Sequence, residues 1–136
     1  MLTPSGATVR LFLHVLGATV WVGGQLTLAG LVPRLRALDV GAPRAAARQF
    51  NRIAWPAFAL LVLTGGWNMS AVDFSEKPTE YQVTMFVKLM FVALGGVGAF
   101  LHAQSRTKRG LAVWGAISGL SSIVTLFFGI LLKTAA

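Results

Sequence analysis

The stretch LHVLGATVWVGGQ, residues 13–25, decides how this chain is built. It is apolar enough to lie in lipid, yet it carries an imidazole, an indole and an amide. Because an α-helix advances about 100° per residue, four of its side chains are predicted to share one stripe roughly 60° wide. These are His14, Ala18, Trp21 and Gln25. Polar groups that share a stripe in a membrane span usually face protein or a water-filled cavity, so we expect the same here.

Composition predicts an integral membrane protein. Of the 136 residues, 55% are hydrophobic and only 12% are charged, about half the charged fraction of a soluble domain. Four apolar runs are each about long enough to cross a hydrocarbon core of about 30 Å. They cover residues 8–32, 53–71, 83–103 and 111–132. We therefore predict an all-α fold, a four-helix transmembrane bundle that forms a single integral membrane domain, residues 1–136.

Prolines and capping signals predict where the helices begin and end. Pro33 is expected to stop the first span, because proline cannot continue the hydrogen-bond ladder. Pro43 stands in the first turn of a basic helical lead-in that should continue into the second span, with a kink near Pro56. The first run lacks a basic leader and a small-residue cleavage site, so it is predicted to be a retained span.

The distribution of charge predicts the orientation. Eight basic residues crowd the first and third connections: Arg34, Arg36, Arg44, Arg48, Arg52, Arg106, Lys108 and Arg109. The second connection holds three of the four acids. The positive-inside rule then places both termini outside the cytoplasm. The chain is expected to be a multi-pass protein of the inner membrane of a bacterium. The net charge of +8 is explained by contact with the lipid bilayer, so nucleic-acid binding is not expected.

Several kinds of chemistry are excluded by the residues present. The chain has no Cys, which rules out disulfides and thiolate metal sites. It contains no HExxH, GxSxG or phosphate-loop motif, and no acid lies inside a span, which argues against a carboxylate proton relay. No catalytic residue is assigned, and the chain is not expected to be an enzyme unless it carries haem.

Depth in the membrane selects the side chains that could form a site. His14 lies about two turns from the outer end of its span, and Lys88 lies one or two turns from the outer end of the third span. Both are therefore predicted to occupy the same outer layer. His102 lies roughly 20 Å deeper than Lys88 by helix rise, so His14 and His102 are not expected to ligate one haem.

Two cofactors suit that outer layer. An imidazole with thioethers from Met69 and Met85 would suit Cu(I), because soft ligands select it. Alternatively, His14 could ligate haem iron while Arg10 or Lys88 binds a propionate. Trp21 and Gln25 would form the cavity wall below either cofactor.

Each of these residues also has a purely structural interpretation. His14 could be a neutral histidine hydrogen-bonded to a neighbouring helix, and Lys88 could extend to the interface. Trp21 could be bundle core, and Gln25 could bond between helices. For His102, at a basic turn, a solvated interfacial position is expected.

The first span resembles that of a known family. HVLGATVWVGG, residues 14–24, followed by LVPRL, residues 31–35, is similar to the first span of the copper resistance protein D family, bacterial membrane proteins of copper handling. TGG at 64–66 and FVKL at 86–89 resemble later blocks of that family. The resemblance covers about residues 10–105. It implies binding or transport of copper.

A second family has a related layout. The four-span, haem-binding protoporphyrinogen oxidases of bacteria also show an LH…W…G…PRL first span, a VKL segment and a downstream histidine. The matching positions are His14, Lys88 and His102. The chain departs from that family after the PRL segment, where LDV stands in place of a histidine, and at its carboxy terminus. This resemblance implies a haem b cofactor.

Three functions follow as hypotheses. The first is a membrane protein that binds or transports a metal, copper above others, at an outer-leaflet site with His14 as principal ligand. The second is a haem b protein, with porphyrinogen oxidation as its activity if it is an enzyme. The third is a subunit or assembly factor without a cofactor, which uses small-residue faces against a membrane partner protein or a second copy of itself.

Overall fold

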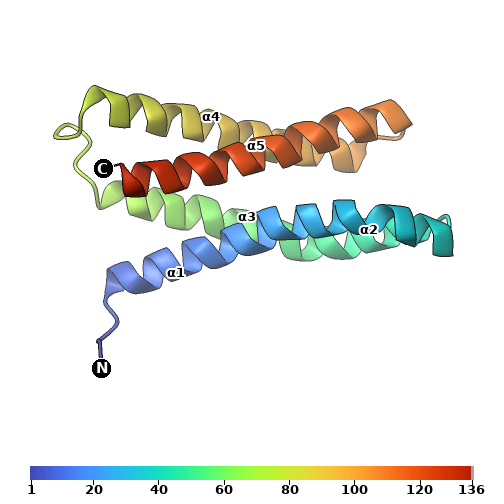
Figure 1. Ribbon diagram of the computed structural model, residues 1–136, viewed down its shortest axis with the longest axis horizontal. Helices are drawn as coiled ribbons and strands as arrows, with labels where there is room; N and C mark the ends of the chain where they lie inside the picture. Colours follow the sequence, from blue (N-terminus) through green and yellow to red (C-terminus); the bar gives the residue numbers. More distant parts are fainter. Residues whose placement is uncertain (136) are drawn as a thin grey trace. The chain divides into compact units, whose positions relative to one another are not determined.

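The part of the chain described here, residues 1–135 of a computed structural model, is mostly helical and contains no strand. This confirms the predicted all-α class. The elements are α1 (Gly6–Ala18), the π-helical turn η1 (Thr19–Gly23), α2 (Gly24–Leu38), α3 (Ala42–Ser70), α4 (Thr79–Gln104) and α5 (Lys108–Thr134). Figure 1 shows α1, η1 and α2 joined end to end as one rod.

The chain divides into two compact units, one spanning Met1–Val72 and the other beginning at Asp73. In the first unit the α1–η1–α2 rod packs against α3, and in the second α4 packs against α5 (Figure 1). Each unit is an antiparallel helical hairpin, since contacts pair early residues of one helix with late residues of the other. The single four-helix bundle stays a prediction.

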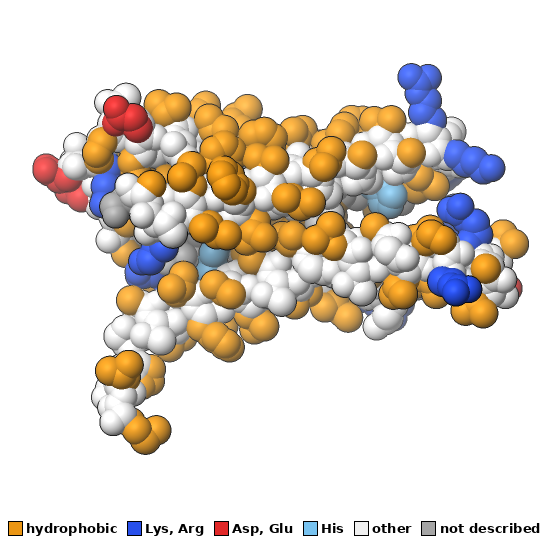
Figure 2. Space-filling model, in the orientation of Figure 1, with side chains coloured by type: hydrophobic (Ala, Val, Ile, Leu, Met, Phe, Trp, Pro, Cys, Tyr) orange, Lys and Arg blue, Asp and Glu red, His pale blue; other side chains and the backbone are white. Residues whose placement is uncertain are grey.

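Within residues 1–135, three helices are long and apolar enough to cross a membrane. They cover Gly6–Leu38, Thr79–Gln104 and Lys108–Thr134. Hydrophobic side chains are exposed along the length of each hairpin (Figure 2), for example Phe86 of α4, which is 65% exposed. Exposed apolar side chains in such numbers are typical of a surface covered by lipid. By length and composition these are the helices of a multi-pass membrane protein.

The expected end of the first helix at Pro33 is wrong. α2 continues through Pro33 to Leu38, because a proline removes one N–H and the following residues, RLRAL, are good helix formers. The expected helical lead-in is confirmed, since Pro43 stands in the first turn of α3 and the helix runs unbroken to Ser70. Pro56 lies inside that helix.

The turn η1 interrupts the regular spacing on which the polar stripe was predicted. Thr19–Gly23 forms a π-helical turn between α1 and α2, and a π turn closes its hydrogen bonds one residue later than an α turn. Each residue in it advances by less than 100°. The stripe from His14 to Gln25 therefore crosses a wider turn, and Trp21 lies within that turn.

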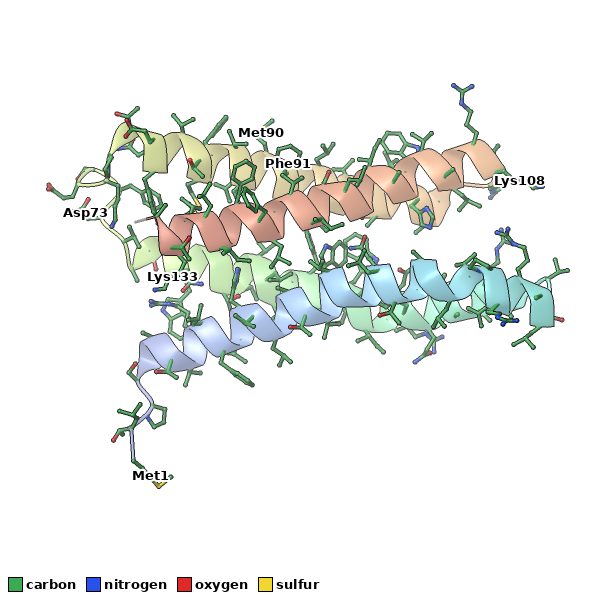
Figure 3. All side chains as sticks on the ribbon, viewed as in Figure 1. Met1, Asp73, Met90, Phe91, Lys108 and Lys133 are labelled. Carbon is green, nitrogen blue, oxygen red and sulfur yellow. The ribbon has the colours of Figure 1, made fainter. Side chains whose placement is uncertain are left out.

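Small residues form the contact between α4 and α5. A methyl group on Gly98 would lie 3.0 Å from the backbone nitrogen of Ser118, and the Ser118 hydroxyl donates to the Gly95 carbonyl over 3.0 Å. Such residues let two backbones approach closely. Farther along, Phe91 stacks with Phe128 at 6.2 Å between ring centroids, and Figure 3 shows Phe91 within this hairpin.

The connection from α3 to α4 is held by local hydrogen bonds of Asp73, which Figure 3 places in that loop. Its Oδ1 accepts from the Ser75 hydroxyl over 2.6 Å and from the Ser75 backbone N–H over 3.1 Å. The Ser75 side chain, and then its backbone N–H, lower the pKa of Asp73 below the ordinary value of 3.8. A carboxylate with a lowered pKa stabilises the folded loop when the pH is above its ordinary pKa. This contribution is lost as the pH falls through the lowered pKa.

Replacing Ser75 by alanine is therefore expected to raise the pKa of Asp73 toward its ordinary value, because the first cause of the shift is removed. The carboxyl carbon of Asp73, followed by NMR during an acid titration, measures this directly. An unchanged midpoint in the variant would contradict the assignment of the hydrogen bond.

Candidate functional site

His14 of α1 is fixed by a chain of two hydrogen bonds that ends on α3. Its Nδ1 lies 2.8 Å from the Thr64 hydroxyl, and that hydroxyl donates to the Leu60 carbonyl over 2.6 Å. A hydroxyl has a single proton. Because the Thr64 proton is directed at Leu60, the Nδ1–H of His14 must be the donor to Thr64. In the neutral imidazole the lone pair then resides on Nε2.

Glycines permit this close approach of α1 and α3. A methyl group on Gly65 would lie 3.4 Å from Cε1 of His14. One turn after His14, a methyl group on Gly17 would lie 3.1 Å from the Ala57 carbonyl oxygen. Gly17 is buried. The imidazole therefore packs against Gly65, and Gly17 brings α1 close to the backbone of α3.

Arg10 lies one turn before His14, toward the end of the hairpin. Its Nε donates to the Asn68 side-chain oxygen over 2.6 Å, and its guanidinium lies 5.8 Å from the centre of the Trp67 ring. A hydrogen bond and a cation–π contact together fix the direction of this side chain. The first hairpin thus carries an oriented cation on the side of His14 away from η1.

Aromatic packing lies on the other side of His14. Trp21 is 5% exposed and its ring lies 4.5 Å from that of Phe58 and 5.6 Å from that of Trp55, measured between centroids. Edge and tilted arrangements at these distances are the favoured ones for aromatic pairs. Trp21 is therefore part of the core of this hairpin, and half-buried Gln25 follows it in the first turn of α2.

Lys88, Met85 and His102 belong to the second hairpin. Lys88 of α4 is half-buried and packs over Gly129, where a methyl group would lie 3.5 Å from its Nζ. Met85, one turn earlier, is also half-buried. At the far end of α4, the His102 Nδ1 donates to the Leu111 carbonyl over 2.8 Å. This bond joins α4 to the first turns of α5.

The predicted site residues thus fall into two groups. Arg10, His14 and Trp21 all contact α3 within the first hairpin, and Met69 lies one turn beyond Gly65 on the same helix. Met85 and Lys88 stand on α4. The common layer of His14 and Lys88 stays a prediction. Among residues 1–135, no three His, Cys, Asp or Glu side chains gather where they could hold a metal ion.

Two residues that orient the site were not predicted from the sequence. Thr64 accepts from His14, and Asn68 accepts from Arg10. They lie one turn apart on α3, as their partners do on α1. The available signal was this matched spacing, with Thr64 standing directly before the glycine pair at 65–66.

Comparison of the chain with protein-family models, with curated proteins and with solved structures finds no match. Inferences about function therefore rest on the contacts within each hairpin.

Proposed function

We propose that the protein is a membrane metal-binding protein in which His14 is a ligand through Nε2, and that the metal is copper. The observation that carries this proposal is the hydrogen-bond chain from His14 through Thr64 to Leu60. Histidines that ligate metals donate their other ring N–H to an acceptor that fixes the tautomer and the ring orientation. Thr64 has that role here.

The co-ligand from the same hairpin in this proposal is the thioether of Met69, one turn beyond Gly65. Imidazole and thioether are ligands that favour Cu(I). No three His, Cys, Asp or Glu side chains gather into a metal-holding group among residues 1–135, so neutral soft donors are proposed to complete the coordination. The site would lie in the outer leaflet, with α3 as a fourth span and both termini outside the cytoplasm, as the arginine-rich connections favour.

A haem b protein is the second candidate, and the placement of Arg10 favours it. Arg10 lies one turn from His14 toward the end of the hairpin, and its guanidinium is fixed by Asn68 and Trp67. A cation so placed could bind a haem propionate while Nε2 of His14 ligates the iron. Bound haem would supply redox chemistry.

An absorption spectrum and metal analysis of the purified full-length chain test both candidates. We expect about one copper per chain after incubation with Cu(I), with no Soret band. A Soret band in the protein as isolated would identify haem, and not copper, as the cofactor. A preparation that retains neither copper nor haem after loading with each would refute both proposals. The remaining hypothesis would then be a subunit or assembly factor without a cofactor.

A further inference from the structure

Five arginines gather where α2 ends and α3 begins, and each is exposed: Arg34, Arg36, Arg44, Arg48 and Arg52. The nearest acid in the sequence is Asp39. Its carboxylate accepts from the Gly41 backbone N–H over 2.7 Å and so stabilises the turn between α2 and α3. Three of the arginines stand at positions i, i+4 and i+8 of one continuous helix. At 100° per residue they share a stripe about 80° wide and about 12 Å long.

We propose that this stripe, Arg44–Arg48–Arg52, is a binding site for the phosphate groups of anionic phospholipids in the leaflet where α2 ends. Orientation by the positive-inside rule requires only that basic residues lie in a connection. Here they lie instead on one face of a continuous helix, so the three side chains leave it on the same side. Arginine is suited to phosphate because its planar fork makes two parallel hydrogen bonds.

The position of the stripe identifies lipid as the occupant. The residue after Arg52 is Ile53, which is 52% exposed, and α3 is apolar from there to Leu63. The stripe therefore ends where the apolar surface of the helix begins. Headgroup phosphates lie at that boundary, and basic clusters next to a membrane helix bind anionic lipid.

The experiment uses the full chain in an uncharged detergent. Native mass spectrometry during titration with phosphatidylglycerol or phosphatidylcholine gives apparent binding constants for each lipid. We expect the wild type to prefer phosphatidylglycerol. Since each arginine near an anionic surface strengthens binding about fivefold, the R44Q/R48Q/R52Q variant should bind phosphatidylglycerol about a hundredfold more weakly, with its binding of phosphatidylcholine unchanged.

Two controls separate the stripe from charge in general. The R106Q/K108Q/R109Q variant loses three charges from exposed positions at the other basic connection, and it should keep most of the preference for phosphatidylglycerol. The R44K/R48K/R52K variant keeps the charge of the stripe but loses the guanidinium fork, so it should bind phosphatidylglycerol more weakly than the wild type and more tightly than R44Q/R48Q/R52Q. Equal binding of both lipids by the wild type, or equal losses in the two glutamine variants, would overturn the proposal, as would a loss in the lysine variant as large as in R44Q/R48Q/R52Q.

Discussion

Replacing Gly98 by leucine is expected to separate α4 from α5 and to unfold the second hairpin. A methyl group at this position would already lie 3.0 Å from the backbone nitrogen of Ser118 and 3.2 Å from its Cα. These are backbone atoms, which cannot rotate away as a side chain would. Overpacking by a few methylenes costs about 1–3 kcal/mol. Because the obstacle here is a helix backbone, we expect a loss above about 3 kcal/mol.

Gly119 of α5 is the matched control for this change. A methyl group there would meet nothing within 4 Å, so Gly119→Leu should unfold at nearly the same temperature as the wild type. Thermal unfolding in detergent, followed by circular dichroism, measures both variants. Equal midpoints for Gly98→Leu and Gly119→Leu would contradict the close approach of the two helices at Gly98.

Replacing His14 by alanine is expected to abolish metal binding if the proposed function is correct, since it removes the imidazole ligand. The sharper variant is Thr64→Val, which keeps the ligand but removes the acceptor of its Nδ1–H. Loss of such a partner typically weakens metal affinity 10–100-fold. It also leaves an N–H without its partner at a cost of about 1–3 kcal/mol in stability.

Thr64→Ser restores the hydroxyl and should recover affinity to within a few-fold of the wild type. Titration of the three variants with Cu(I) against a competing chelator gives the affinities, and thermal unfolding checks that each protein is folded. Wild-type affinity in a folded Thr64→Val variant would show that the hydrogen bond does not orient the ligand. Wild-type affinity in His14→Ala would exclude His14 as a ligand.

Much of the fold could be predicted, because it depends on the length and periodicity of the apolar runs. Apolar runs of about 20 residues become helices in lipid, since a helix satisfies all of its backbone groups within the segment. The helical lead-in at Pro43 followed from the preference of proline for the first helical turn. Such inferences require only local sequence and the solvent, and they were confirmed by α3.

Two local features of the first helical rod differ from the prediction. Pro33 does not end α2, because proline removes only one hydrogen bond and the helix formers that follow it continue the ladder. The π turn at Thr19–Gly23 was not expected either. Its local signal is the β-branched content of that stretch, in which Thr and Val side chains lose freedom in an α-helix.

The use of small residues between helices was predicted in kind. Gly115 packs against His102, whereas Gly119, four residues later, has open space around it. Only the pairing of α4 with α5 shows which small residue faces the partner helix.

The candidate site could be predicted only from one side. His14, Arg10 and Trp21 stand out because each is unusual in an apolar run. Their partners on α3 depend on the register in which α1 packs along α3. Side-chain packing along the whole hairpin sets that register. Thr64 and Asn68 therefore had no signal of their own beyond a spacing that matches that of His14 and Arg10.

The two histidines fasten their hairpins in the same way. His14 donates through Nδ1 to Thr64, and His102 donates through Nδ1 to the Leu111 carbonyl. Each bond joins the two helices of one hairpin and fixes the tautomer and the ring orientation of its imidazole. Each hairpin therefore carries a histidine hydrogen bond that limits the sliding of one helix along the other.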